Sequence, residues 1–278
     1  MKQITGLVLE GERALFKEQD ANIENCIFQN GESPLKESNN ITLKECTFDW
    51  KYPLWYSNNI KVTQTMFNET ARSGIWYTNN ITITDSILNC PKTFRKSSYI
   101  KLDNVRIANA QETFWGCNNI DLDHVSVKGD YFIFNSQNIK VNNFRILGNY
   151  TFDSCKNIEV TNAYMESKDS FWNCENVIVK DSTIIGEYIG WNSKNLTFIN
   201  CDIESLQGFC YIENLTLINC RLHNTTLAFE YSTVNVEVTN EIDSIKNPIS
   251  GKIMAKKINE IILDDESLDK SKIEIIEG

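Results

Sequence analysis

Tryptophan rings recur at a fixed spacing along this sequence, together with tyrosines and charged residues that a carbohydrate site would use. Five of the six tryptophans stand five residues before a recurring apolar position: Trp55, Trp76, Trp115, Trp172 and Trp191. Neighbouring positions hold further candidates for binding: Tyr56, Tyr77, Tyr131, Arg72 and Lys92. Apolar sugar faces stack on aromatic rings, whereas sugar hydroxyls need polar partners. The column therefore predicts an oligosaccharide-binding face, and side-chain alternation along a strand predicts that its rings point outward.

Acidic residues flank the tryptophan column and could act as acid and base at a glycosidic bond. They occupy five successive repeats: Glu112, Asp130, Asp153, Asp169 and Glu187. Stacked strands lie about 4.8 Å apart, so acids one or two repeats apart would stand about 5 or about 10 Å from each other. These separations bracket those of retaining and inverting glycosidases, roughly 5 and 6.5–9.5 Å. A uronic-acid substrate would also engage Arg72, Lys92 or Arg95, and a lyase would use a base such as Arg95.

An internal repeat of 19 to 21 residues defines these positions. Its anchor is an apolar residue that follows asparagine in most repeats: Ile41, Ile60, Ile81, Ile100, Ile120, Ile139, Ile158, Val177, Leu196, Leu215 and Val234. Further apolar columns lie two and seven residues after the anchor and six residues before it. Apolar spacing of two within each repeat indicates strands and not helices. A short coil of this kind cannot bury its own apolar face, so neighbouring coils must stack.

The repeat predicts an all-β fold, a single-stranded right-handed parallel β-helix of about twelve coils. Asparagine before the anchor suits a tight corner because it tolerates a left-handed backbone, and its stacked amides should form a ladder. Residues 1–242 are expected to form the β-helix. Residues 243–278 break the register at Pro248 and Gly251, so they are expected to form a C-terminal cap packed on the same domain.

Composition limits the partners and the compartment. A net charge of −10 argues against nucleic acid and anionic membranes, since both need basic patches. No apolar run is long enough for a secretory signal or a membrane span. Nine cysteines without a C-x-x-C pair indicate reduced thiols and a cytoplasmic location. The abundance of Asn, Lys and Ile is typical of a bacterial gene.

The sequence predicts no cofactor and no metal site. Glycine motifs of nucleotide-binding loops are absent, and the cysteine spacing does not match a zinc site. The two histidines, His124 and His223, lie five coils apart, so they cannot share a metal ion.

Several longer blocks carry a resemblance to a known family. They are GESPLKES (31–38), WKYPLWYS (50–57), KNIEV (156–160), GEYIGWNSKNL (186–196) and SIKNPISG (244–251). Over nearly its whole length the chain resembles an uncharacterised bacterial family catalogued as domain of unknown function 3737. The resemblance implies a right-handed β-helix similar to the pectin-lyase superfamily. It brings no established activity, so it implies no catalytic residues.

Two functions are compatible with these residues. One is a carbohydrate-active or carbohydrate-binding β-helix protein, a glycoside hydrolase or polysaccharide lyase if it is an enzyme. The other is a non-catalytic scaffold that uses the same face for a protein partner. Aromatic stacks between coils can also stabilise a β-helix without any ligand, so the tryptophan column has a structural interpretation as well.

Overall fold

The structure, a computed structural model, describes residues 1–278 and consists of β-strands with two short 3₁₀ segments, Glu69–Ala71 and Lys270–Lys272. The strands wind into a right-handed parallel β-helix of about 15 turns, which confirms the fold expected from the repeat. None of its helices is long and apolar enough to span a membrane. The chain divides into two compact units, Met1–Arg145 (unit 1) and Ile146–Gly278 (unit 2).

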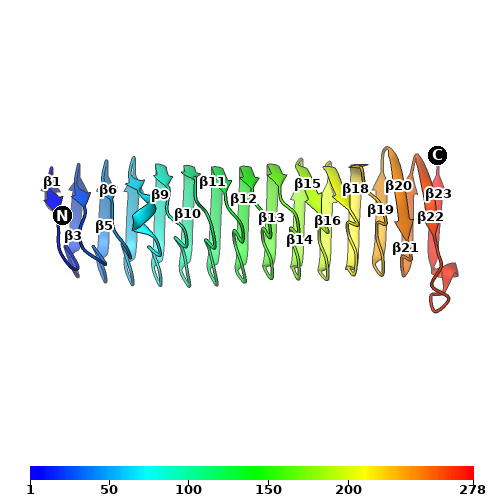
Figure 1. Cartoon of the computed structure of the whole chain (residues 1–278), viewed down its shortest axis with the longest axis horizontal. Coiled ribbons are helices and arrows are strands. Elements are labelled where there is room, and N and C mark those ends of the chain that lie inside the picture. Colours follow the sequence, from blue (N-terminus) through cyan, green and yellow to red (C-terminus); the bar gives the residue numbers. More distant parts are fainter. The chain divides into compact units, whose positions relative to one another are not determined.

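Figure 1 labels most of the strands along the chain. Unit 1 contains β1 (Lys2–Thr5), β2 (Val8–Leu9), β3 (Gln19–Glu24), β4 (Ile27–Phe28), β5 (Asn39–Lys44), β6 (Thr47–Phe48), β7 (Asn58–Thr63), β8 (Met66–Phe67), β9 (Asn79–Leu88), β10 (Ser98–Ile107), β11 (Asn118–Lys128) and most of β12 (Gln137–Leu147). Unit 2 contains β13 (Lys156–Glu166), β14 (Glu175–Lys180), β15 (Thr183–Glu187), β16 (Lys194–Ile199), β17 (Asp202–Leu206), β18 (Glu213–His223), β19 (Thr233–Val238), β20 (Glu241–Lys246), β21 (Ser250–Ala255), β22 (Lys257–Ile262) and β23 (Ile273–Glu277). Within each unit, successive coils pair as parallel neighbours.

The expected count of about twelve coils is too low, because both ends of the chain also form coils. β1 pairs in parallel with β3, although its residues lack the asparagine-anchor pattern. β21 pairs in parallel with β19 and with β23. Gly251 stands opposite Val234, at the anchor position. A Cβ at Gly251 would lie 1.8 Å from the Val234 carbonyl oxygen, so the glycine fits this close approach and does not interrupt the coil.

The apolar columns form continuous buried stacks in both units. The anchors of unit 1 pair in register from Ile41 to Ile120, and those of unit 2 from Val177 to Val234. In a second column the rings of Phe28, Phe48 and Phe67 stack, with successive centroids 4.6 and 4.7 Å apart. Like residues at matching positions thus exclude water between coils, as the repeat predicts.

The predicted amide ladder is present at the corner before the anchors. In unit 2 the side-chain amides of Asn176, Asn195 and Asn214 each donate to the asparagine one coil earlier, at 3.0, 2.9 and 2.9 Å. These residues have φ values of 60°, 56° and 70°. Asparagine is favoured at such a corner because it accepts a left-handed backbone and can satisfy its own amide along the stack.

All nine cysteines are buried thiols. Burial raises the pKa of the Cys90 thiol to about 11 and that of Cys117 to about 12. Thiols with such pKa values stay protonated at neutral pH and are poor nucleophiles. These two cysteines therefore act as small apolar core residues.

Candidate functional site

In unit 1 the predicted tryptophan column is half-buried, and its rings stack on one another. Trp55 and Trp76 lie nearly parallel, with ring centroids 5.1 Å apart and an interplanar angle of 9°. Each indole N–H donates to a backbone carbonyl of the next coil: Trp55 to Ser73 at 2.6 Å, Trp76 to Lys92 at 2.8 Å and Trp115 to Tyr131 at 3.1 Å. Much of the ring surface and all three donors are therefore used inside the protein. This is the geometry of a stabilising stack.

Arg95 fills the gap between Trp76 and Trp115 in the same column. Its guanidinium carbon lies 4.6 Å from the Trp76 ring centroid and 4.8 Å from that of Trp115. Its Nη2 lies 3.5 Å from Glu112 Oε2, which Lys92 Nζ also approaches to 3.1 Å. The Arg95 Nε is buried and has no hydrogen-bond partner. Three charged residues predicted for catalysis or binding thus form one ion cluster, in which Glu112 pairs with both Lys92 and Arg95.

The other predicted residues of unit 1 are dispersed around this stack. Tyr56 and Tyr77 are exposed and stack on each other, with ring centroids 4.7 Å apart. Arg72 is exposed, whereas Asp130 and Tyr131 are half-buried. Unit 1 therefore presents one open aromatic pair.

Replacing Arg95 tests whether the stack stabilises the fold. Arg95→Ala should lower the free energy of unfolding by about 1–3 kcal/mol, because it removes two cation–π contacts and the packing of the side-chain stem. Arg95→Phe keeps a flat side chain between the rings and removes the unpartnered Nε, so its stability should stay near that of the wild type. Urea unfolding of the three proteins measures both effects. Equal stability of wild type and Arg95→Ala would contradict the stacking role.

In unit 2 the structure brings together three predicted acids on successive coils, Asp153, Asp169 and Glu187. Asp169 is half-buried, and its pKa is raised, first by burial and then by the negative charges of Glu187 and Asp153. The charge of Lys168 and a hydrogen bond with Tyr150 act in the opposite direction. A carboxyl group that keeps its proton to higher pH than usual is suited to act as a general acid.

Polar partners hold the other two carboxylates of this group. Asp153 Oδ1 accepts hydrogen bonds from Ser154 Oγ at 2.8 Å and Asn173 Nδ2 at 3.2 Å. Glu187 Oε1 accepts from Lys168 Nζ at 2.7 Å. Both carboxylates are therefore oriented beside Asp169 before any ligand arrives.

Aromatic rings lie beside these acids in unit 2. The ring centroids of Trp172 and Trp191 are 6.2 Å apart with an interplanar angle of 34°, and Tyr150 meets Trp172 edge-on at 6.1 Å. The indole N–H of Trp172 donates to the Tyr188 carbonyl at 2.7 Å. Compared with the parallel pair in unit 1, these rings are farther apart and more tilted. Trp191 also packs against Tyr188 and Tyr211, with ring centroids 5.8 and 4.8 Å away.

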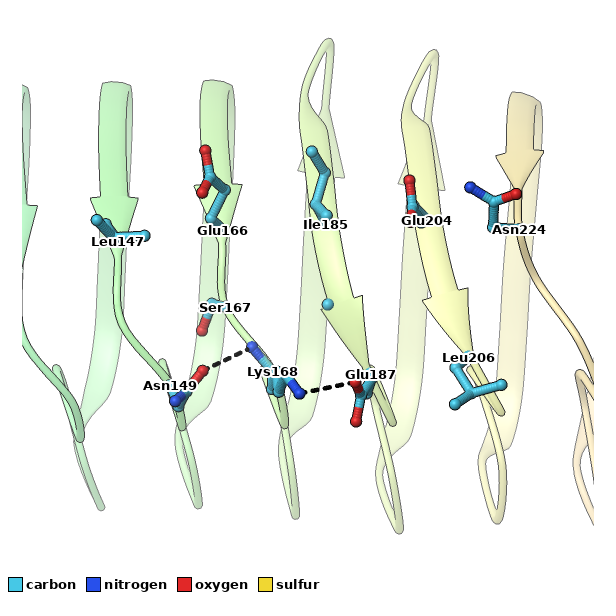
Figure 2. Close-up of a pocket in the computed structure, with 11 residues that line it drawn as sticks. Leu147, Asn149, Glu166, Ser167, Lys168, Ile185, Glu187, Glu204, Leu206 and Asn224 are labelled. Carbon is cyan, nitrogen blue, oxygen red and sulfur yellow. Dashed lines mark hydrogen bonds and ion pairs between the residues drawn. The ribbon is translucent and has the colours of Figure 1, made fainter.

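A groove of about 470 Å³ lies next to the acids, with Lys168 and Glu187 on its wall (Figure 2). Two rows of side chains line it: Glu166, Ile185 and Glu204 in one, and Lys168, Glu187 and Leu206 in the other. Small residues, Ser167 and Gly186, occupy the chain between the rows. A Cβ on Gly186 would lie 2.2 Å from the Ser167 carbonyl oxygen, so this close packing of two coils requires glycine.

Glu166 and Glu204 are candidate residues that the sequence analysis did not include. The register pairs Glu166 with Ile185 and Ile185 with Glu204, so the two acids are two coils apart, about 10 Å. Tyr164 donates its hydroxyl to Glu166 Oε1 at 2.9 Å. Both acids stand eight residues after an anchor, directly after a buried residue of their strands, Met165 and Ile203. Because side chains alternate along a strand, a residue next to a buried one faces outward. This position in the repeat could therefore have identified both acids as surface candidates.

The family follows from the sequence match. A family model described as a protein of unknown function (DUF3737) matches residues 2–276. The chain belongs to this family. No curated protein matches the sequence. The resemblance seen in the sequence blocks is thereby confirmed, and for DUF3737 the site has to be interpreted from its own geometry.

Several solved structures match this DUF3737 member at low identity. PfbA, a surface adhesin of Streptococcus pneumoniae, is 11% identical with a TM-score of 0.44, over 77% of this chain and 71% of that chain. The A-module of mannuronan C-5 epimerase AlgE6 from Azotobacter vinelandii is 9% identical with a TM-score of 0.46, over 99% and 90%. The catalytic domain of a GH87 alpha-1,3-glucanase is 12% identical with a TM-score of 0.38, over 98% and 63%. All three TM-scores are below 0.5, so neither the fold nor an activity of this chain follows from these matches.

Proposed function

We propose that unit 2 binds a neutral oligosaccharide and hydrolyses a glycosidic bond in it, with Asp169 as proton donor. The observation that carries this proposal is the group of Asp153, Asp169 and Glu187 beside Tyr150 and Trp172. Carboxylates in differing environments next to a stacking surface are what glycoside hydrolysis requires. The adjacent groove gives the sugar chain a concave surface.

The charge of the site favours a neutral sugar over a uronic acid. Acidic residues predominate around the groove, and Lys168 is the only basic residue that lines it. Lys168 is already 2.7 Å from Glu187. A uronate would therefore meet repulsion from Glu166, Glu187 and Glu204 without a free cation to balance it. Two of the three cations that the sequence suggested for a uronic acid, Arg95 and Lys92, contact Glu112 in unit 1, and the third, Arg72, is exposed in unit 1.

The same charges favour hydrolysis over elimination. A lyase that removes a proton beside a uronate needs a free base and a cation near the substrate carboxylate. Lys168 contacts Glu187, and no other cationic side chain lines the groove. A half-buried carboxyl group with a raised pKa, in contrast, supplies the proton that a departing sugar oxygen needs.

A thermal-shift screen tests the binding step. A ligand at 100 times its dissociation constant should stabilise the native protein by about 2.7 kcal/mol. Neutral oligosaccharides should raise the melting temperature, whereas uronic acids and sugar phosphates should not. Trp172→Ala should abolish the ligand-induced shift. Trp55→Ala, a matched change in the parallel pair of unit 1, should keep it.

Three results would contradict the proposal. The first is that no sugar in a broad panel at saturating concentration raises the melting temperature. The second is a preference for uronates. The third is that Trp55→Ala loses the ligand-induced shift in melting temperature while Trp172→Ala keeps it. If no sugar binds, the alternative function, a non-catalytic scaffold that binds a protein partner, would be favoured.

A further inference from the structure

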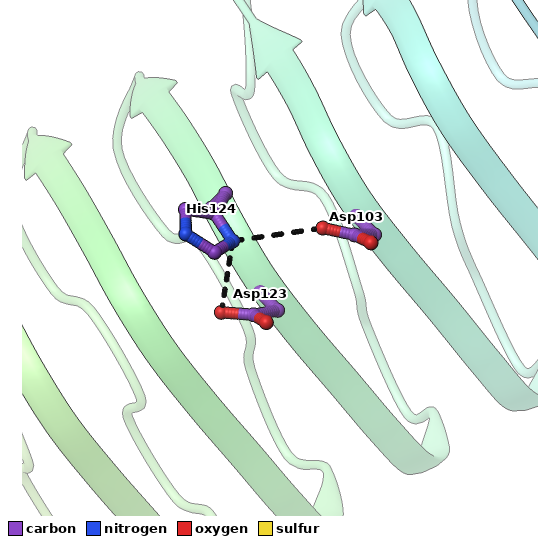
Figure 3. A group of neighbouring side chains, drawn as sticks. All are labelled: Asp103, Asp123 and His124. Atoms are coloured by element: carbon purple, nitrogen blue, oxygen red, sulfur yellow. Dashed lines mark ion pairs between the residues drawn. The ribbon is translucent and has the colours of Figure 1, made fainter.

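The geometry points to a binding site for a divalent transition-metal ion in unit 1, formed by Asp103, Asp123 and His124 (Figure 3). One ligand atom from each of the three side chains lies within 4.8 Å of the other two. His124 Nδ1 is 3.2 Å from Asp123 Oδ1 and 3.6 Å from Asp103 Oδ1. Figure 3 shows the imidazole edge turned toward both carboxylates. The site is independent of the function proposed for unit 2.

The strand register explains why a cation is needed here. β10 and β11 pair so that Asp103 stands directly opposite Asp123. In the same outward column, the step from Asp123 to Asn142 is a hydrogen bond from Asn142 Nδ2 to Asp123 Oδ1 at 3.0 Å. The step from Thr63 to Thr84 is also a hydrogen bond, from Thr84 Oγ1 to Thr63 Oγ1 at 3.1 Å. Like charges directly opposite each other destabilise a sheet. The step from Asp103 to Asp123 therefore places two negative charges opposite each other, whereas the next step, from Asp123 to Asn142, is a hydrogen bond.

The donor set selects the class of metal. Calcium and magnesium prefer oxygen ligands alone, whereas an imidazole nitrogen with carboxylate oxygens suits zinc and its first-row neighbours. Three protein ligands at a half-exposed position leave further coordination positions to water. Zinc is therefore the appropriate probe.

An outer shell orients one of the ligands. The side-chain amides of Asn142 and Asn143 each donate to Asp123 Oδ1 at 3.0 Å. These two hydrogen bonds fix the position of the carboxylate oxygen that faces His124 Nδ1. Hydrogen bonds from outer-shell residues to a ligating carboxylate commonly raise metal affinity. The sequence analysis missed the site because it considered only whether the two histidines could meet.

The second histidine provides a matched control. His223 Nε2 lies 3.2 Å from Asp202 Oδ1. The same carboxylate accepts two hydrogen bonds from Arg221, at 2.6 and 2.8 Å. The guanidinium supplies the positive charge at this place, so His223 should not bind a metal.

Isothermal titration with Zn²⁺ at pH 7.5 tests the proposal on the full chain. The wild type should bind one equivalent that His124→Ala and Asp103→Asn lose or bind about tenfold or more weakly. His223→Ala should titrate like the wild type. The side chain of His124 is 60% exposed, so its removal leaves the core intact. The proposal is overturned if the wild type and His124→Ala titrate alike, or if His223→Ala loses the same equivalent.

Discussion

Replacing Asp169 by asparagine is expected to lower the rate of glycosidic hydrolysis by about 10²–10⁴-fold, the contribution of a positioned proton donor. Asparagine keeps the size of the side chain but has no proton of suitable acidity to transfer. The rate of release of reducing ends, measured on the oligosaccharide that the thermal-shift screen identifies, gives the effect. Asp202→Asn is the matched control, because Asp202 lies in unit 2 and pairs with Arg221. It should keep the wild-type rate. A fully active Asp169→Asn would contradict the assignment of the proton donor.

The same variant should change stability with pH in a defined direction. The pKa of Asp169 is raised in the folded state, first by burial and then by Glu187 and Asp153. The folded protein therefore holds this proton more tightly than the unfolded chain, and stability falls as pH rises through the raised pKa. The amide of asparagine cannot ionise, so Asp169→Asn should melt at a higher temperature than the wild type at pH 7. The difference should vanish below about pH 4, the ordinary pKa of a carboxyl group.

Replacing Asp202 by asparagine should change the melting temperature in the opposite direction. The pKa of Asp202 is lowered, chiefly by the hydrogen bond from Arg221. The stability it contributes is present above the unfolded pKa and is lost as pH falls through the lowered folded pKa. Asp202→Asn should therefore melt below the wild type at pH 7, with the difference shrinking in acid. Melting curves from pH 3 to pH 7 that shift the two variants in the same direction would refute this account.

Gly186→Ala is expected to lower the free energy of unfolding by about 3 kcal/mol, the upper end of the usual range for overpacking. The added Cβ would lie 2.2 Å from the Ser167 carbonyl oxygen and 2.9 Å from its carbonyl carbon. These are backbone atoms, and β15 cannot move away because it pairs with β13 on one side and β17 on the other. The clash should also displace the backbone at Gly186, which lies between the two rows of side chains in the groove. Saccharide binding should therefore weaken.

Gly6→Ala separates this clash from ordinary backbone strain. Gly6 has a φ of 68°, but nothing lies within 4 Å of its missing Cβ. Only the left-handed backbone then opposes the substitution, at a cost of about 1–2 kcal/mol. Urea denaturation followed by circular dichroism compares the two variants. A Gly186→Ala protein that is no less stable than Gly6→Ala would show that the coils can separate locally.

The fold was predictable because the same pattern is repeated in every coil. The columns of anchors, phenylalanines and asparagines each recur many times, so an irregularity in one coil, such as Tyr99 before Ile100, does not obscure the register. The predicted coil count was too low because the coils at the two ends of the chain keep the same geometry with different residue types. Gly251 is read as a break, although it occupies an anchor position at which two backbones approach too closely for any side chain.

The candidate site was predictable in position and only partly in detail. Spacing places Trp55 and Trp172 on the same face of their coils, but it does not reveal that one ring stacks in parallel while the other is tilted. The orientation of a ring depends on which residues pack against it from the next coil. The spacing of tryptophans along the sequence does not contain that information. Glu166 and Glu204 were missed because they become candidates only through the groove that they line. Small residues such as Gly186, between the two rows of lining side chains, form this groove.

The ladder of asparagine amides has a consequence for how the chain folds and changes. Its partners are separated by only 19 to 21 residues. Relative contact order is then on the order of 0.07, a value typical of helical bundles and well below that of most all-β proteins. Folding should accordingly be fast for a β protein. An insertion or deletion of one complete coil preserves every column, whereas inserting or deleting a single residue within a strand turns its apolar face outward.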